Sequence, residues 1–584
     1  MTMAKKRLII GLIAGALAFL CGCSDGQLPP TDSQTTDSAT VTESPAIKED
    51  IWAVRSGKAQ FIICYENADC RSTAENLASL LKAKTKTEFS VIRGTGLLNG
   101  RSAIFVGEVV DDSLKSVYRE KGISYSGYGA VYANGNVYLC GYTAETVDRA
   151  MRKFMSGLVA EDTAKGEDGK PQTFFSESMF FLYQPTYEIV DATLLGAPLS
   201  AYRLVIPSDA GNTLQETVRI FQTLVGEKTG VALPIVNDRT EVAAHEIVIG
   251  FAKSRSASAS LQESYGLLDY QLVSADGAVA IGYGGKIALI AAGTDLLDRI
   301  SAKDADTISV TSSAKETLLR DSAVERSYET DYRFMSYNLL GVQETDTHCS
   351  LQMRTDLAAE YILAFSPDSV GVQELNGGNR SCLQKTELLD TYTLVSFAGV
   401  GSPWVSTLYK TAKFDLLESN CISIQVHDSQ NYYMTWVALK DKATGQVVIH
   451  ANLHLDYSSA KNRLEQAVLV NAELKRAMAK YPGAMLGMSG DYNTTADVTD
   501  LFLALENGTG LRDAQELLPD DRNDADRNSC PGVCTPGALL LGSPIDHILI
   551  NTDTTEALLH DVIQDDLVCH ASDHYPVIVD VRKA

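Results

Sequence analysis

The chain has 584 residues, of which 45% are hydrophobic and 21% charged, and it carries a formal net charge of −24 at pH 7. This length exceeds what one hydrophobic core usually serves and indicates roughly three or four domains in a soluble globular protein. The acidic balance argues against tight, nonspecific binding to long nucleic acids, because such binding depends on Lys and Arg side chains that neutralise phosphates.

The first residues have the pattern of an export signal. Basic residues at positions 5–7 precede an apolar run at 8–20, too short for a conventional transmembrane span, and a small-residue cleavage site follows that ends in Cys23. The pattern resembles the lipobox of bacterial lipoproteins, which implies a signal peptide over 1–23, lipidation of Cys23 and an exported protein anchored to the cell membrane. An ordinary secretory signal is the alternative. Residues 24–50, rich in Ser, Thr, Asp and Pro, are predicted to form a disordered tether.

Cysteine usage gives little functional information. Nine cysteines follow Cys23, an odd number for an exported protein. Cys530 and Cys534 could close a small loop through a disulfide, and no pair of C-x-x-C motifs has the spacing of a zinc site. The sequence therefore predicts neither a redox function nor a zinc site.

Between residues 51 and 325 the chain repeats one order of elements. Strand, helix and strand patterns at 61–65, 73–81 and 102–107 recur at 202–206, 217–228 and 245–250. Further strands are expected at 131–139, with a hairpin turn at Asn134-Gly135, and at 279–290. The repeat predicts two small α/β modules, at 51–185 and 186–325.

These modules resemble the small α/β domain that accompanies the catalytic barrel of bacterial hexosaminidases. That resemblance implies an accessory role, as a spacer or as a surface that binds a glycan. His245 is the only histidine between the signal and residue 330. It is interpreted as a structural histidine on a buried strand.

Polar residues end a series of strand-like runs in the last domain, predicted at 331–584, which holds eight of the nine histidines. Because polar groups at strand ends typically line a cleft, these residues are candidates for a site. In Gly490-Asp-Tyr-Asn493, residues two apart in a strand would point the same way. The candidate side chains are Asn338, Glu374, His454, Asp491, Asn493, Asp546, Asp573 and His574.

The ordered motifs S-Y-N, Q-E, N-x-H, G-D-x-N, I-D-H-I and S-D-H resemble the endonuclease/exonuclease/phosphatase superfamily, which includes deoxyribonucleases, apurinic endonucleases, neutral sphingomyelinases and inositol polyphosphate 5-phosphatases. The resemblance covers about residues 331 to 582. It implies a four-layer α/β/β/α sandwich, with two mostly antiparallel sheets packed together and helices outside. It also implies a metal-dependent phosphoester hydrolase.

Roles follow from the resemblance position by position. Glu374, with Asn338 beside it and Asp573 nearby, would hold Mg²⁺, since this hard cation prefers oxygen ligands; Mn²⁺ is a second candidate. Asp491 would deprotonate the attacking water, and Asn493 would bind a phosphate oxygen. His574, oriented by Asp546, would stabilise the transition state. His454 would contact phosphate or protonate the leaving group. His547 is expected to point to the opposite face of its strand and is left out.

Departures from the family pattern bear on the substrate. Leu340 stands where apurinic endonucleases carry a polar residue. The segment 401–406 lacks the acidic residue that steadies the histidine matching His454 in deoxyribonuclease-like members, which leaves the acid role of His454 in doubt. Acidic residues near 520–526 would repel polyanions if they border the cleft.

The preferred substrate is accordingly a lipid headgroup or another small phosphoester. An extracellular nuclease is the alternative. A surface glycan-binding protein with an inactive hydrolase scaffold is the competing non-enzyme hypothesis. The domain at 331–584 is expected to keep its activity when it is expressed alone.

Overall fold

A computed structural model describes the chain over residues 40–43, 51–107, 124–158, 163–166, 169–252, 254–317, 325–327, 329–341, 349–397, 403–427, 430–519, 523, 527–530, 542–564 and 568–584. These residues form a mixed α/β protein, which confirms the predicted fold class. The signal with Cys23, the acidic residues near 520–526 and Cys534 lie outside the described residues. Among the described helices, none combines the length and apolarity needed to cross a membrane.

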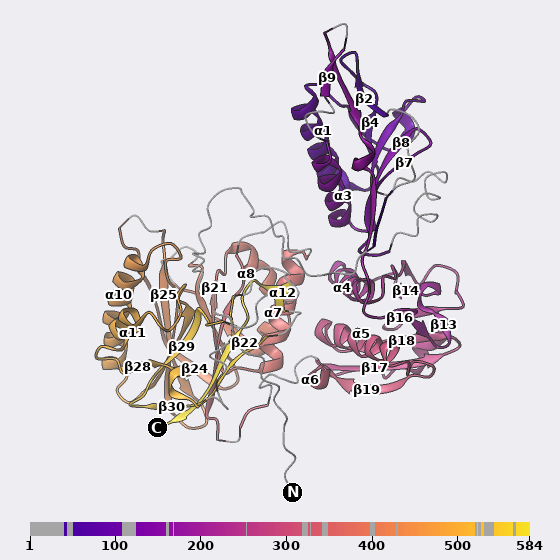
Figure 1. Cartoon of the computed structure of the whole chain (residues 1–584). Coiled ribbons are helices and arrows are strands. Elements are labelled where there is room, and N and C mark those ends of the chain that lie inside the picture. The colour runs from indigo at the N-terminus through magenta and orange to yellow at the C-terminus, as the bar shows by residue number, and fades with distance from the viewer. Residues whose placement is uncertain are drawn as a thin grey trace, which may run out of the picture.

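The first module has a seven-stranded and a four-stranded sheet, with helices α1 (Arg71–Thr85) and α3 (Ala144–Ser156). It lies at the upper right of Figure 1. The larger sheet has the order β1 (Thr40–Glu43), β11 (Phe181–Gln184), β7 (Tyr128–Ala133), β8 (Asn136–Gly141), β6 (Ala103–Val106), β4 (Ile62–Tyr65) and β5 (Val91–Arg93). The smaller has the order β3 (Lys58–Ala59), β2 (Ile51–Arg55), β10 (Pro171–Phe175) and β9 (Thr163–Lys165).

The second module repeats this topology in a six-stranded sheet. Its order is β15 (Ile235–Asn237), β14 (Arg203–Ile206), β16 (Glu246–Ile249), β18 (Ala278–Tyr283), β17 (Asp269–Ala275) and β19 (Ser309–Ser313). Its helices are α4 (Asn212–Thr229), α5 (Lys286–Ser301) and the short α6 (Ala314–Thr317), and β12 (Thr193–Leu194) pairs with β13 (Ala197–Pro198). Across the larger sheet of the first module from β5 to β11, three parallel strand pairs are followed by two antiparallel pairs. The sheet of the second module has the same order from β15 to β19. The internal repeat is therefore confirmed.

The structure corrects three local predictions in these modules. The strand expected at 279–290 ends at Tyr283, because Gly284 and Gly285 interrupt it and the following apolar residues enter helix α5. Part of the predicted tether is a strand, since β1 pairs with β11. His245 precedes β16 rather than lying within it, and it is only half-buried. The Asn134-Gly135 hairpin is as predicted, with both residues at positive φ.

The C-terminal part is the predicted sandwich of two six-stranded sheets, seen at the left of Figure 1. One sheet has the order β22 (Tyr392–Leu394), β23 (Ser406–Lys410), β21 (Ser369–Gln373), β20 (Tyr332–Asn338), β31 (Val577–Lys583) and β30 (Thr555–Val562). The other has β24 (Phe414–Ser423), β25 (Tyr433–Asp441), β26 (Val447–His454), β27 (Met485–Asp491), β29 (Asp546–Asn551) and β28 (Leu511–Asp513). Strands β20 and β21 of the first sheet face β26, β27 and β29 of the second.

Helices complete the outer layers of the sandwich. On the side of the first sheet these are α7 (Leu351–Phe365), α8 (Gly377–Leu383), α9 (Leu388–Thr391) and α12 (Val568–Ala571). On the other side, α10 (Ala460–Lys480) packs against α11 (Thr499–Glu506), and its Ala467, Val470 and Leu474 are buried in the core with Ile449 and Leu486. An apolar helix face over an apolar sheet face is the usual way in which such a layer is stabilised.

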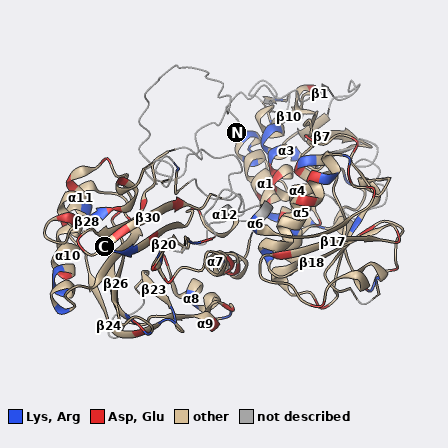
Figure 2. Cartoon of the chain, turned by 90° about the horizontal axis from the view of Figure 1, so that it is seen from below, with Lys and Arg blue, Asp and Glu red and all other residues tan. Residues whose placement is uncertain are grey.

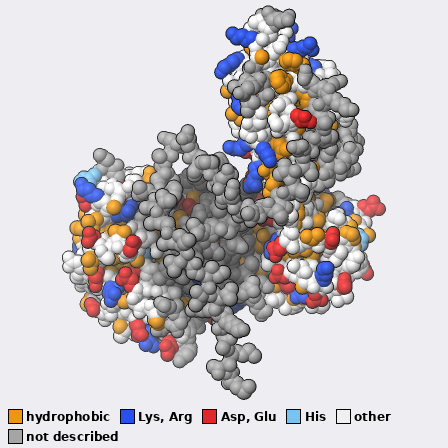
Figure 3. Space-filling view, in the orientation of Figure 1, with side chains coloured by type: hydrophobic (Ala, Val, Ile, Leu, Met, Phe, Trp, Pro, Cys, Tyr) orange, Lys and Arg blue, Asp and Glu red, His pale blue; other side chains and the backbone are white. Residues whose placement is uncertain are grey.

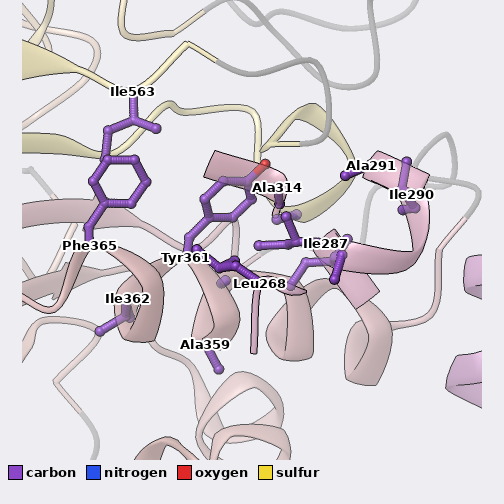
Figure 4. Packing of buried hydrophobic residues seen from close by; sticks show 14 of the residues in the cluster. Leu268, Ile287, Ile290, Ala291, Ala314, Ala359, Tyr361, Ile362, Phe365 and Ile563 are labelled. Atoms are coloured by element: carbon purple, nitrogen blue, oxygen red, sulfur yellow. The ribbon is translucent and has the colours of Figure 1, made fainter. Parts of the chain in front are cut away.

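The second module and the sandwich share one hydrophobic core. Figure 4 shows Tyr361 of α7 near Ile287 of α5, with Leu268 and Ala314 alongside. Glu360 of α7 accepts hydrogen bonds of 3.0 Å from the backbone N–H groups of Lys286 and Ile287, which are unsatisfied donors at the start of α5. Separation of 331–584 would expose this apolar face and a buried carboxylate, so we expect the isolated domain to be less stable than the full chain; whether it keeps its activity stays a prediction.

A buried histidine joins the two sheets of the sandwich. The ring of His450 on β26 lies between the hydroxyls of Ser369 and Ser489, 2.6 Å from its Nδ1 and 3.0 Å from its Nε2. Burial lowers the pKa of His450 to about 3. The folded protein therefore cannot protonate this ring between pH 3 and 6.5, whereas the unfolded chain can. The stability that neutral His450 contributes is complete above pH 6.5 and is lost as the pH falls below it.

We expect this histidine to make the protein acid-sensitive. From pH 7 to pH 5, the His450 contribution to the free energy of unfolding should fall by about 2 kcal/mol, at about 1.4 kcal/mol per pH unit. Denaturant unfolding at both pH values should show a smaller loss in His450→Gln, whose amide can still bond to the serines without titrating. His427→Gln, which changes an exposed histidine, is the control. Equal losses in the wild type and His450→Gln would contradict the prediction.

Candidate active site

Strand ends from both sheets meet at one edge of the sandwich. Asn338 ends β20 in one sheet, and Asp491 ends β27 in the other. The register of the second sheet places Asp491 between His454, its parallel neighbour, and Asp546, its antiparallel neighbour. The predicted grouping of polar strand ends is therefore present in the structure.

Asn338 lies at the centre of the site and is fully buried. Its Nδ2 is 3.2 Å from Glu374 Oε1, 3.1 Å from Asp491 Oδ2 and 3.4 Å from His574 Nε2. Its Oδ1 accepts a hydrogen bond from the Leu340 N–H at 3.1 Å. In this orientation Asn338 bridges two carboxylates through its nitrogen. Direct metal coordination through its oxygen, as predicted, would use the second lone pair of that oxygen, because the first accepts from the Leu340 N–H.

The loop after β20 fixes Glu374. The Gly341 N–H donates to Glu374 Oε2 at 2.7 Å, and Glu374 itself has a left-handed backbone with φ of 56°. Arg354 of α7 donates to the Leu340 carbonyl at 3.1 Å. A non-glycine residue at positive φ costs free energy, so it persists only where its surroundings hold it. The position of the Glu374 carboxylate is thus set by several hydrogen bonds.

His574 and Asp546 form a buried pair with 2.7 Å between Nδ1 and Oδ2. Burial by itself would lower the pKa of His574, but the Asp546 carboxylate outweighs it and holds that pKa well above its usual value. The imidazole is therefore charged at neutral pH. Its Nε2 faces Asp491, 3.7 Å from Oδ2, so that the charge is directed into the site.

His454 lies on the other side of Asp491. Its Nε2 is 3.5 Å from Asp491 Oδ2, and its ring meets that of Tyr432 edge-on with 5.7 Å between centroids. The carboxylate beside His454 is thus Asp491 itself. This neighbour differs from the separate acidic residue of deoxyribonuclease-like members, so the acid role of His454 stays a prediction.

Asn493 lies beside Asp491 in a turn, whereas the prediction placed both residues in one strand. Strand β27 ends at Asp491, and Asn493 follows in a left-handed conformation with φ of 51°. A turn holds it, in which the Asn493 N–H donates to Asp491 Oδ1 at 2.8 Å and its Nδ2 donates to the Leu455 carbonyl at 3.0 Å. Strand periodicity therefore does not align the two residues, although they are adjacent. The predicted phosphate contact of Asn493 is not tested.

Two sets of residues could hold a metal ion. Glu374 and Asp573 offer hard oxygen ligands, and burial raises the pKa of Asp573, with the negative charge of Glu374 adding to the effect. A divalent cation would relieve that repulsion, so these residues fit Mg²⁺ or Mn²⁺. The ligand atoms of Asp491, Asp546 and His574 also lie within 4.8 Å of one another. This second set fits less well, because the protonated His574 has no lone pair on Nε2 to offer a cation.

Two residues that contact the site belong to none of the six sequence motifs. Ser529 is fully buried, donates to Asp546 Oδ2 at 2.7 Å and accepts from the Asp546 N–H at 3.1 Å. Its neighbour Cys530 is half of a predicted disulfide whose other half, Cys534, lies outside the described residues, so that pairing stays a prediction. Tyr432, whose ring contacts His454, is the second of these residues. His547 was rightly left out, since it forms a separate buried pair with Asp513 at 2.7 Å.

Comparisons with known proteins give limited similarity. No protein-family model matches the sequence, and no curated protein matches it. Solved structures similar over 43% of this chain include the mannosyl-6-phosphatase Bt3783 of Bacteroides thetaiotaomicron VPI-5482, at 20% identity, 100% of that chain and a TM-score of 0.36. The human Nocturnin catalytic domain gives 18%, 94% and 0.35, and D. rerio TDP2 gives 17%, 98% and 0.34. At such identities and TM-scores the likeness carries no functional argument.

Proposed function

We propose that this chain is a metal-dependent phosphoester hydrolase. The observation that carries the proposal is the hydrogen-bonded network in which Asn338 joins Glu374 to Asp491 while His574 presents a charged imidazole to the same point. Two carboxylates and a buried cation gathered at one strand edge are costly to fold. Such groups are typical of sites that stabilise charge in a reaction.

The roles of the side chains follow from their positions. Asp491, near two histidines and the Asn338 amide, orients the attacking water and accepts its proton. The charged His574 stabilises the negative charge that develops on the phosphoryl oxygens, and Asp546 keeps it protonated. Glu374 and Asp573 would hold a divalent cation, which neutralises charge on the phosphoryl group and on the leaving oxygen. His454 faces the leaving group or a phosphate oxygen.

The proposed location is the outer side of a cell membrane, with the protein held by a lipid on Cys23. The support is the basic, apolar and Leu-Cys-Gly-Cys order of residues 5–23. Near such a surface, lipid headgroups and other small phosphoesters are within reach. Cys23→Ser should release the protein from the membrane fraction, and a variant that stays there would contradict the anchor.

Charge favours a small substrate over nucleic acid. Figure 2 shows basic and acidic residues interspersed along α10 and its neighbours, and Lys461 and Arg476 are paired with Glu465 and Glu473. On the face shown in Figure 3, acidic side chains are scattered over the sandwich among hydrophobic and basic ones. Acidic residues outnumber Lys and Arg by about two to one in 331–584, whereas nucleic-acid binding needs basic surface. An extracellular nuclease remains the second candidate.

The test is an assay of the full chain on bis(p-nitrophenyl) phosphate and p-nitrophenyl phosphate. We expect hydrolysis that stops in EDTA and returns with Mg²⁺ or Mn²⁺. Plasmid DNA and RNA in the same panel test the nuclease candidate. A protein inert toward every phosphoester with every divalent cation would favour the non-enzyme hypothesis, in which the tandem modules bind a surface glycan.

A further inference from the structure

A side pocket of about 450 Å³ lies next to His454. It is lined by His427, Gln430, Tyr432, Asp456, Tyr457, Ser458, Lys461 and Asn462, and this volume falls in the range of small-molecule sites. Tyr432, which forms part of its wall, also contacts the His454 ring. The pocket therefore adjoins the histidine that is proposed to face the leaving group or a phosphate oxygen.

One wall of the side pocket is rigid. Asp456, only 2% exposed, accepts hydrogen bonds from the Ser458 N–H and hydroxyl at 2.8 Å and from Asn462 Nδ2 at 3.0 Å. Burial acts to raise the pKa of Asp456, but the hydrogen bonds from Asn462 and Ser458 lower it overall. Asp456 thus shapes the wall as a fixed anion. The Asn462 side-chain oxygen has no hydrogen-bond partner among the described residues.

The Tyr432 hydroxyl is a hydrogen-bond donor that has no acceptor within the described parts of the chain. Its hydroxyl oxygen accepts from the Tyr457 N–H at 3.3 Å, and no described residue accepts its proton. The side chain is 9% exposed, and burial raises the pKa of Tyr432 to about 12, so the hydroxyl keeps its proton. A buried donor without an acceptor is unfavourable unless a ligand supplies one. The exposed ring of Tyr457 stands beside it.

We propose that the side pocket binds the leaving group of the substrate, and that this group is a polyol, so that the enzyme hydrolyses the phosphate ester of a sugar or a cyclitol. This substrate class rests on the proposed function, because it applies only to a phosphoester hydrolase. A polyol offers neighbouring hydroxyls that accept from Tyr432 and donate to Asn462, and its C–H face packs on Tyr457. Water adds to phosphorus, the bond from phosphorus to the polyol oxygen breaks, and the polyol leaves as the alcohol with inorganic phosphate as coproduct.

Other leaving groups fit the side pocket less well. No aliphatic side chain lines it, so an acyl chain would find no apolar wall. A nucleobase gains most of its affinity from stacking, and two lining residues have exposed rings, Tyr457 and His427, of which His427 is ion-paired with Glu465 at 2.6 Å. The polyol phosphate itself could be free or the headgroup of a lipid, and these two sources share the same chemistry.

The test measures kcat/KM of the full chain in Mg²⁺ for glucose 6-phosphate, myo-inositol 1-phosphate, ribose 5-phosphate, AMP and p-nitrophenyl phosphate, where AMP and ribose 5-phosphate differ by the base. Vesicles that contain a phosphorylated phosphatidylinositol separate the lipid source from the free one. We expect a polyol phosphate to be the best substrate. Tyr432→Phe should lower its kcat/KM about 10-fold or more, as for loss of one buried hydrogen bond, and should lower that for p-nitrophenyl phosphate less, because Phe keeps the ring beside His454 and the aryl group has no hydroxyl for the pocket to bind.

Tyr457→Ala is a second variant at an exposed position and should raise KM for the polyol phosphate without affecting folding. Tyr481→Phe, which removes a hydroxyl bonded to Glu418 near the end of α10, is the matched control and should leave both substrates unchanged. Equal loss on both substrates in Tyr432→Phe, no loss in either pocket variant, or a higher kcat/KM for AMP than for ribose 5-phosphate and the other polyol phosphates would overturn the inference while the hydrolase activity stands. A wild type inert toward all substrates would instead refute the proposed function, and this inference with it.

Discussion

Replacing His574 with alanine should lower the turnover of phosphoester hydrolysis by about 10² to 10⁴, the range for loss of an electrostatic or acid-base catalyst. The reason is the charge that Asp546 maintains on a ring whose Nε2 faces the site. Single-turnover and steady-state rates at saturating Mg²⁺ would measure the effect, with thermal unfolding as a check on folding. His245→Ala, in the second module, is the matched histidine control and should retain full activity.

Asp546→Asn tests whether the charge of His574, rather than its shape, is what matters. The amide can still accept a hydrogen bond from Nδ1, but it no longer raises the pKa of the imidazole. Activity at neutral pH should fall less than in His574→Ala, and it should recover partly as the pH is lowered and the ring becomes protonated. Wild-type turnover in His574→Ala would refute its assignment to the site.

Motif order located the site because five of the six motifs lie at strand ends, which meet at an edge of the packed sheets, and the sixth, S-D-H, lies in the loop between α12 and β31. The two residues whose contacts sequence could not predict, Ser529 and Tyr432, reach the site from a segment before β29 and from the start of β25. Serine and tyrosine have many roles, so neither stands out without its partner. His450 was missed for the same reason, since a histidine within an apolar strand shows its function only through the serines around it.

The repeat of strands and helices predicted the topology of both modules but not how the second one packs. That contact depends on Glu360, which in sequence is one more charged residue on a helix and in space caps the start of α5. Helix α7 carries this carboxylate on one side and Arg354, which holds the Leu340 carbonyl, on another. The second module thus supports the helix that positions the loop beside Glu374, a coupling that no local pattern encodes.

Glu374→Gln and Asp491→Asn together should distinguish the two candidate metal sites. Each variant replaces a carboxylate with an amide of the same shape, and each amide can keep the hydrogen bonds from Gly341 or Asn493 to its oxygen. If Glu374 holds the cation, Glu374→Gln should raise the Mg²⁺ concentration for half-maximal activity by about 10-fold to 100-fold, the scale on which changes around a metal site lower its affinity.

The variants should then respond differently to added metal. Activity of Glu374→Gln should return at high Mg²⁺ or with Mn²⁺, because the protein scaffold around the ion is intact. Asp491→Asn should stay about 10² to 10⁴ below wild type at every metal concentration, because the group that accepts the proton of water is gone. Rescue of Asp491→Asn by metal, with no change of metal dependence in Glu374→Gln, would instead place the cation between Asp491, Asp546 and His574, where three ligand atoms already lie within 4.8 Å.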